Sequence, residues 1–173
     1  MAAEATGEVR SVEELDLSRY LGLWYEVGRL PLKYQDEDSR DVTAEYSFNE
    51  DGSVRVDNRC LDGDGEPIQA VARALPVEGA SGQLKVNFLP KFLRWLPFTE
   101  GDYWVLGLDP GYRVALVGSP DREHLWLLSR TPALADAARE TYLATARAQG
   151  FVLDDWIDTP QSGARVTDDQ VTD

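Results

Sequence analysis

Hydrophobic and polar residues alternate along most of the first half of the chain, and this period of two is typical of strands with one buried face. The alternation is clearest in segment 41–48, whose apolar face carries Val42, Ala44, Tyr46 and Phe48. Similar segments cover 24–30, 53–60, 67–75 and 83–88. Because the turn sequences NEDG and DGDG separate three of these segments, we expect a meander of antiparallel strands.

The pattern changes in the second half, where segments 102–108, 112–118 and 124–130 are apolar on both faces. Strands of this kind must be covered on both sides. A helical segment follows, for which we expect Thr131 as the N-cap, Pro132 at the first helical position and Gly150 at the end. We expect this helix to cover the apolar strands, with a short final strand in 151–158 after it.

These elements predict an all-β fold: an eight-stranded antiparallel up-and-down β-barrel with one C-terminal α-helix packed on its outside and a short ninth strand. The barrel domain is expected to cover 15–159, after a flexible acidic lead-in (1–14) and before a loose polar tail (160–173). A barrel of this size can hold one small ligand. Small residues expected to face inward would leave room for it, namely Ala44, Ala70, Ala72, Ala74 and Gly107.

Composition narrows the classes of function. The net charge of −14 argues against nucleic-acid binding, which needs clustered Lys and Arg. A single cysteine excludes an internal disulfide, and one histidine with one cysteine leaves little for triad chemistry, so we expect no enzyme, cofactor or metal. The first ten residues contain no apolar signal-peptide core. We therefore expect a periplasmic or outer-membrane-associated protein if a leader was removed, and a cytoplasmic one otherwise.

Two distant motifs carry a family resemblance. GLWYEVGR (22–29) resembles the G-x-W-Y signature of lipocalins, and LWLLSR (125–130) resembles the signature in which an arginine ends the eighth strand. LDPGYRVAL (108–116) is a looser match to the middle signature. The chain is most similar to the bacterial and plant branch, which includes relatives of apolipoprotein D and plant temperature-induced lipocalins. The resemblance implies that Gly22, Trp24 and Arg130 form the closed end, with the guanidinium stacked on the indole.

The resemblance also implies a cavity for fatty acids, lysophospholipids, retinoids or porphyrins. Strand parity and the resemblance together give these candidate ligand contacts: Tyr46, Val56, Val86, Phe88, Tyr103, Trp126 and His124. We expect Trp126 at mid-height in the cavity, and Tyr103 and His124 near its mouth. Glu26 shares a face with Trp24, so it would be a buried acid that needs an arginine partner. The strand alternation places the Cys60 side chain on the inward face, and we interpret it as a small hydrophobic residue.

The stretch FLPKFLRWLPF (88–98) is unusually apolar for a connection between strands. It is similar to the loop of plant temperature-induced lipocalins that is linked to membrane association, and we place it at the open mouth. Its aromatic residues Phe92, Trp95 and Phe98 are candidates for membrane contact; a dimer interface and packing over the barrel rim are the alternatives. Cations that would hold a ligand head group at the mouth are Lys33, Arg59, Lys91 and Arg94.

The sequence therefore predicts binding and transport or storage of a hydrophobic small molecule, with a fatty acid or lysophospholipid preferred. Carriers of haem, another tetrapyrrole or a retinoid are alternatives, as is a lipid-modifying enzyme that uses Cys60 or Tyr103. Expected partners are the small ligand and a peripheral membrane contact, with no nucleic acid. The chain itself is expected to be a monomer or weak homodimer.

Overall fold

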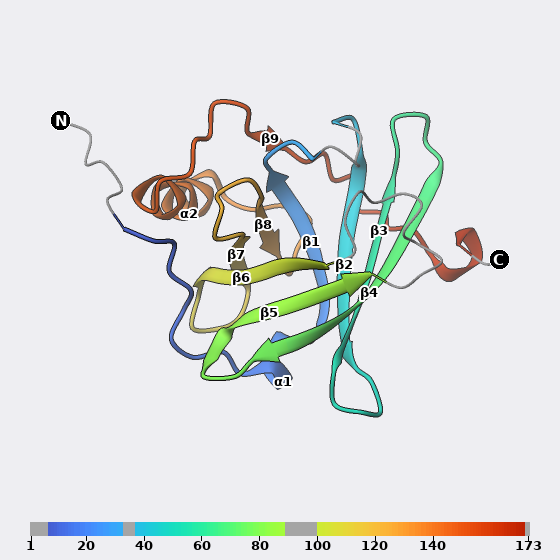
Figure 1. Ribbon diagram of the computed structural model, residues 1–173. Helices are drawn as coiled ribbons and strands as arrows, with labels where there is room; N and C mark the ends of the chain where they lie inside the picture. The colour runs from blue at the N-terminus through green and yellow to red at the C-terminus, as the bar shows by residue number, and fades with distance from the viewer. Residues whose placement is uncertain (1–6, 33–36, 89–99, 172–173) are drawn as a thin grey trace.

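The strands of the chain form one closed antiparallel barrel (Figure 1). The computed structural model describes residues 7–32, 37–88 and 100–171. Strands β2 to β8 pair in chain order, and β1 closes the barrel by pairing with both β8 and β2. The strands are β1 (Gly22–Arg29), β2 (Arg40–Phe48), β3 (Val54–Leu61), β4 (Pro67–Val77), β5 (Ala80–Phe88), β6 (Glu100–Leu108), β7 (Val114–Gly118), β8 (Leu125–Ser129) and β9 (Ile157–Asp158). The predicted eight-stranded barrel with a short ninth strand is confirmed.

Closure depends on β1, which pairs with two strands along different parts of its length. Gly22 to Tyr25 pair with β2, and Tyr25 to Arg29 pair with β8. A bulge between Glu26 and Gly28 bends β1 at the change of partner. The end of β1 also pairs with β9. These pairings leave no free edge on β1 and β2, the strands at which an open sheet would end.

The two main helices lie at different places on the barrel. The short helix α1 (Leu17–Tyr20) crosses the closed end, and α2 (Asp136–Ala148) packs against the outside near β7 and β8 (Figure 1). The predicted helix start at Thr131 and Pro132 is wrong. The Thr131 hydroxyl donates to the Ala133 carbonyl oxygen at 2.7 Å, a local turn that competes with helix formation. No helix within the described ranges combines the length and apolar character needed to cross a bilayer.

Two apolar clusters account for the strands that are hydrophobic on both faces. One fills the lower barrel around Trp24, and the other lies between the barrel and α2 around Leu116 and Leu127. Gly107 belongs to the outer side, because a Cβ placed there would lie 3.4 Å from Tyr142 of α2. The prediction that Gly107 faces the cavity is therefore wrong. The register shift between Val105 and Gly107 reverses the alternation at this point.

The N-terminal lead-in is packed where it is described, which corrects the expectation of a flexible segment. The Val12 amide donates to the Val105 carbonyl oxygen at 2.8 Å, and Val9 is buried in the cluster beneath α2. Ser81 donates from its hydroxyl to the Glu13 carbonyl oxygen. These contacts tie residues 9–13 to β5 and β6.

The C-terminal segment is also attached to the barrel rather than loose. The Gln161 side-chain amide donates to the carbonyl oxygens of Glu26 and Val42, at 2.8 and 2.9 Å. Ser162 binds the Asp41 carboxylate through its amide and its hydroxyl, and Val166 is buried. The short helix η2 (Asp168–Gln170) follows. The described tail thus covers the outside of β1, β2 and β3.

Candidate functional site

The closed end of the barrel is built around Trp24 and Arg130, as predicted. The Arg130 guanidinium lies 3.8 Å from the centre of the Trp24 ring. It donates to the carbonyl oxygens of Arg19, Tyr20, Leu21, Leu23 and Tyr112, which fixes α1 and the turn before β7 beneath the barrel. Gly22 has a φ of +99°, and a Cβ there would lie 3.3 Å from the guanidinium. The positive φ favours a glycine at this position, and the nearby guanidinium leaves little room for a Cβ.

Above this plug lies a cavity of about 410 Å³. Its wall is largely apolar and comes from β1 to β8 and the loops at the opposite end, which we call the mouth. All seven predicted ligand contacts line the cavity: Tyr46, Val56, Val86, Phe88, Tyr103, Trp126 and His124. The predicted small residues Ala44 and Ala70 line it as well, whereas Ala72 and Ala74 belong to the packed core below. The volume falls within the range of about 300–1,000 Å³ that is usual for small-molecule sites.

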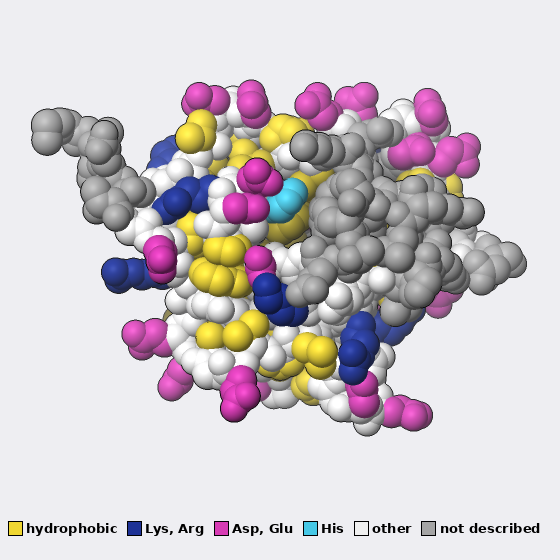
Figure 2. All heavy atoms as spheres, viewed as in Figure 1, with side chains coloured by type: hydrophobic (Ala, Val, Ile, Leu, Met, Phe, Trp, Pro, Cys, Tyr) yellow, Lys and Arg dark blue, Asp and Glu magenta, His cyan; other side chains and the backbone are white. Residues whose placement is uncertain are grey.

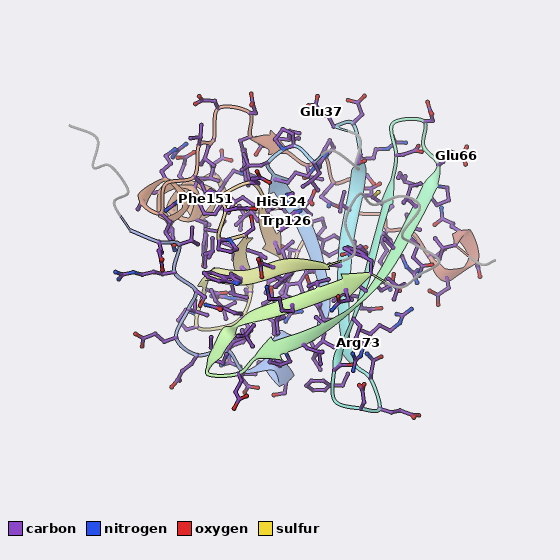
Figure 3. The ribbon with its side chains drawn as sticks, viewed as in Figure 1. Glu37, Glu66, Arg73, His124, Trp126 and Phe151 are labelled. Carbon is purple, nitrogen blue, oxygen red and sulfur yellow. The ribbon has the colours of Figure 1, made fainter. Side chains whose placement is uncertain are left out.

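Trp126 and His124 form an aromatic wall in the upper part of the cavity. Their rings are stacked, with centroids 5.7 Å apart and an angle of 14° between the planes. Both residues come from the beginning of β8 and its preceding loop (Figure 3). In Figure 2 the imidazole is visible at the surface next to acidic side chains, which places His124 at the rim as predicted. A flat aromatic face is thus available to a ligand that enters through the mouth.

Tyr103 lies deeper than predicted. Its hydroxyl is 2.6 Å from the Tyr20 hydroxyl and 2.7 Å from the Tyr46 hydroxyl. Tyr20 comes from α1 and packs on Trp24, with ring centroids 5.0 Å apart. Tyr46 and Tyr103 therefore line the bottom of the cavity, and Tyr20 packs beneath them; we call these three residues the tyrosine floor (Tyr20, Tyr46 and Tyr103). The expectation that Tyr103 lies at the mouth is wrong. Burial raises the pKa of all three hydroxyls, so they stay protonated at neutral pH.

Glu26 is buried, lines the cavity and has the arginine partner that was predicted for it. One Glu26 oxygen lies 3.0 Å from the Arg29 guanidinium and accepts a hydrogen bond from the Thr159 hydroxyl at 2.7 Å. Burial raises the pKa of Glu26, and the nearby Arg29 acts in the opposite direction. The pair holds β1 to the segment after β9. Both side chains are almost completely inaccessible to solvent, which agrees with a structural interpretation of the pair.

Cys60 also lines the cavity, near the mouth end of β3. Burial raises the pKa of its thiol to about 11, although a hydrogen bond with Ser39 acts in the opposite direction. At neutral pH the group is therefore a thiol rather than the thiolate that a nucleophile requires. This chemistry does not favour the lipid-modifying enzyme as an alternative. Within the described residues, no group of three or more His, Cys, Asp or Glu could hold a metal ion.

The described part of the mouth is acidic. Asp102 and Asp121 line it, and Asp102 forms an ion pair with Lys85. Arg59, a predicted head-group ligand, lies along the cavity, but its guanidinium binds Asp57 at 3.0 Å and Asp168 at 2.7 Å. These ion pairs hold the C-terminal segment to β3, and the head-group role of Arg59 stays a prediction.

Several predicted residues lie outside the described ranges. They are the head-group candidates Lys33, Lys91 and Arg94 and the loop aromatics Phe92, Trp95 and Phe98. Sequence reasoning missed Tyr20 and Arg29. Tyr20 follows the N-cap signal of Asp16 in the short helix, but no local pattern shows that this helix turns under the barrel.

Comparison with known proteins agrees with this architecture. A family model described as a lipocalin-like domain matches residues 15–161. Temperature-induced lipocalin-1 of Arabidopsis thaliana is 36% identical over 157 residues, which cover 90% of this chain and 84% of that protein. The outer membrane lipoprotein Blc of Escherichia coli K12 is 37% identical over 158 residues, with 90% and 85% coverage. Bovine (Bos taurus) apolipoprotein D is 32% identical over 128 residues, with 70% and 64% coverage.

Solved structures show the same fold at low sequence identity. Insecticyanin from the tobacco hornworm Manduca sexta superimposes with a TM-score of 0.70 at 19% identity, covering 95% of this chain and 91% of that one. Apocrustacyanin C1 gives a TM-score of 0.71 at 18% identity, with 90% and 84% coverage. Fold, plug and cavity together support binding and transport of a hydrophobic small molecule. The chain belongs to the lipocalin family.

Proposed function

We propose that the protein binds a fatty acid or lysophospholipid, with the acyl chain in the barrel and the head group at the mouth, and that it carries or stores this lipid without making or breaking a bond. The observation that supports this most is the largely apolar cavity of about 410 Å³ above the Trp24 plug. Burial of about sixteen carbons at about 0.8 kcal/mol each gives about 12 kcal/mol before the cost of association. After that cost, micromolar or tighter affinity is expected.

A substitution that fills the cavity tests this proposal. Ala70 lines the cavity from β4, so a phenylalanine there would displace about three methylene groups of the ligand. We expect Ala70→Phe to weaken lysophospholipid binding by about fiftyfold, which corresponds to about 2.4 kcal/mol. Isothermal titration calorimetry of the delipidated protein measures this change.

Leu75→Phe is the matched control, because Leu75 lies on the same strand with its side chain 39% exposed. It should leave affinity unchanged. If Ala70→Phe binds the lipid as tightly as the unmodified protein while remaining folded, the acyl chain does not occupy the cavity.

We further propose that the segment 89–99 contacts a membrane. Its composition supports this, since Phe92, Trp95 and Phe98 occur beside Lys91 and Arg94. The relative named an outer membrane lipoprotein also supports it. We expect Phe92→Ser/Trp95→Ser to reduce flotation with phosphatidylcholine–phosphatidylglycerol vesicles by about tenfold or more, because each aromatic contributes about 1.5–3 kcal/mol when buried.

Val152→Ser serves as the control for this flotation experiment. Val152 is a hydrophobic side chain that is 68% exposed, and it lies after α2 rather than in the loop. Its replacement should leave flotation unchanged. Equal flotation of the loop variant and the unmodified protein would contradict membrane contact through this segment.

A further inference from the structure

The tyrosine floor contains one more hydrogen-bond donor than its internal bonds use. Three hydroxyls carry three protons, but only two hydrogen bonds join them, Tyr20 to Tyr103 and Tyr46 to Tyr103. Each of these bonds uses one proton. Among the described residues the three hydroxyls have no other hydrogen-bond partner, so one O–H group is left over.

The geometry decides where the remaining proton points. Tyr20 is 1% exposed and does not line the cavity, whereas Tyr46 and Tyr103 both do. A Tyr20 proton that was not given to Tyr103 would be a buried, unsatisfied donor, which is costly. Tyr20 therefore donates to Tyr103. The spare proton then belongs either to Tyr46, if Tyr103 donates to it, or to Tyr103, if Tyr46 is the donor.

In both arrangements the spare donor belongs to a residue that lines the cavity. Its apolar neighbours on the wall include Ala44, Val56, Val86 and Leu128. The Glu26 carboxylate also lines the cavity, but it already accepts hydrogen bonds from Arg29 and Thr159. The methyl end of a plain acyl chain would leave this donor without a ligand partner. An oxygen at the inserted end of the ligand would accept its hydrogen bond in a low-dielectric site, where such bonds are strong.

We propose that the tyrosine floor selects apolar ligands that carry a neutral carbonyl oxygen at the end inserted into the barrel. This rests on the proposed function, in which the head group remains at the mouth. A neutral acceptor fits better than a carboxylate, which would lose its hydration on burial. Arg130, which lies beneath the floor, already donates to five backbone carbonyls and stacks on Trp24.

The test compares two ligands by calorimetry: a long-chain fatty acid, and the same acid with a ketone on the penultimate carbon of its chain. We expect the unmodified protein to bind the keto acid about threefold to tenfold more tightly, the gain typical of one neutral hydrogen bond. Tyr46→Phe should keep this preference, because Tyr20 then donates to Tyr103 and the Tyr103 proton still faces the cavity. The double variant Tyr46→Phe/Tyr103→Phe removes both cavity-facing donors and should lose it.

The double variant leaves the Tyr20 hydroxyl without its partner, so the triple variant Tyr20→Phe/Tyr46→Phe/Tyr103→Phe provides a fully apolar floor of nearly the same shape. It should bind both acids equally. Tyr142→Phe, on α2 outside the barrel, should keep the preference for the keto acid. The proposal for the tyrosine floor would be contradicted if the unmodified protein bound the two acids equally, or if the triple variant kept the preference for the keto acid. Neither result would contradict the proposed lipid-binding function. Failure of both acids to bind would contradict the donor site, and failure of a lysophospholipid to bind as well would contradict the proposed function.

Discussion

Replacement of Arg29 by methionine is expected to lower the free energy of unfolding at pH 7 by about 3–5 kcal/mol, because it leaves the Glu26 carboxylate buried without its counterion. The Arg29 side chain is completely inaccessible and lies 3.0 Å from Glu26. Thr159 would remain as the only side-chain donor to this carboxylate among the described residues. Urea unfolding monitored by circular dichroism measures the change.

The loss should depend on pH with a defined sign. Burial raises the folded-state pKa of Glu26 above its ordinary value of 4.5, and removal of Arg29 takes away the main opposing influence. The ionised group therefore costs stability above the folded-state pKa, and this cost disappears below the unfolded-state value, where both states are protonated. The difference between the variant and the unmodified protein should shrink as the pH falls from 7 towards 4.5.

Two controls separate burial from charge in this experiment. Arg147→Met removes an exposed arginine, 3.7 Å from Glu140 on α2, and should change stability by no more than about 0.5 kcal/mol. Glu26→Gln/Arg29→Met should recover part of the loss, because no unpaired charge remains. Two results would contradict this description of the Glu26–Arg29 pair. One is a loss of unfolding free energy for Arg29→Met as small as that for Arg147→Met. The other is a loss that is the same at pH 4.5 and at pH 7.

Trp24→Ala is expected to destabilise the barrel by about 3–5 kcal/mol, as is usual when a large aromatic is removed from a core. The Trp24 side chain is completely buried, and its indole nitrogen donates to the Tyr20 carbonyl oxygen at 2.8 Å. Its loss would also remove the ring on which Arg130 stacks. Chemical denaturation of Trp24→Ala, compared with Trp24→Phe, measures the effect.

A double-mutant cycle isolates the contribution of the stacked pair. Trp24→Ala, Arg130→Met and their combination should give a coupling energy of about 0.5–2 kcal/mol. Trp24→Phe should retain part of this coupling because it keeps an aromatic face. A coupling energy of zero would show that Arg130 stabilises the closed end only through its hydrogen bonds to backbone carbonyls.

Local patterning was sufficient to predict the barrel and most of its lining. A strand period of two assigns Val56 and Val86 to the inner face without knowledge of their partners, and the structure places both on the cavity wall. The Trp24 and Arg130 pair could be predicted because each belongs to a recognisable motif. Their contact needs only that the first and eighth strands close the barrel.

The incorrect or missing predictions involve irregular backbone and distant partners. Two residues of β1 oppose one residue of β8 at the bulge, so Arg29 returns to the face of Glu26 despite the odd spacing between them. A similar shift in β6 turns Gly107 towards α2. The depth of Tyr103 depends on Tyr20, which is 83 residues away in the chain. A strand period cannot reveal any of these.

The attached terminal segments were missed for a related reason. Both are polar, and polarity alone favours exposure. Their attachment comes from single side chains that bond to strand backbones or strand carboxylates, such as Gln161 to the Glu26 and Val42 carbonyl oxygens and Ser162 to the Asp41 carboxylate. Such contacts carry no periodic signal in the sequence.

The central claim, that an acyl chain occupies the barrel, is tested most directly by intermolecular nuclear Overhauser effects. The experiment uses methyl-labelled protein and a lysophospholipid below its critical micelle concentration. We predict contacts between the acyl chain and the methyl groups of Val56 and Val86 on the cavity wall, and none with the exposed Val152. Contacts with Val152, or the absence of contacts with Val56 and Val86 at saturating lipid, would contradict the claim.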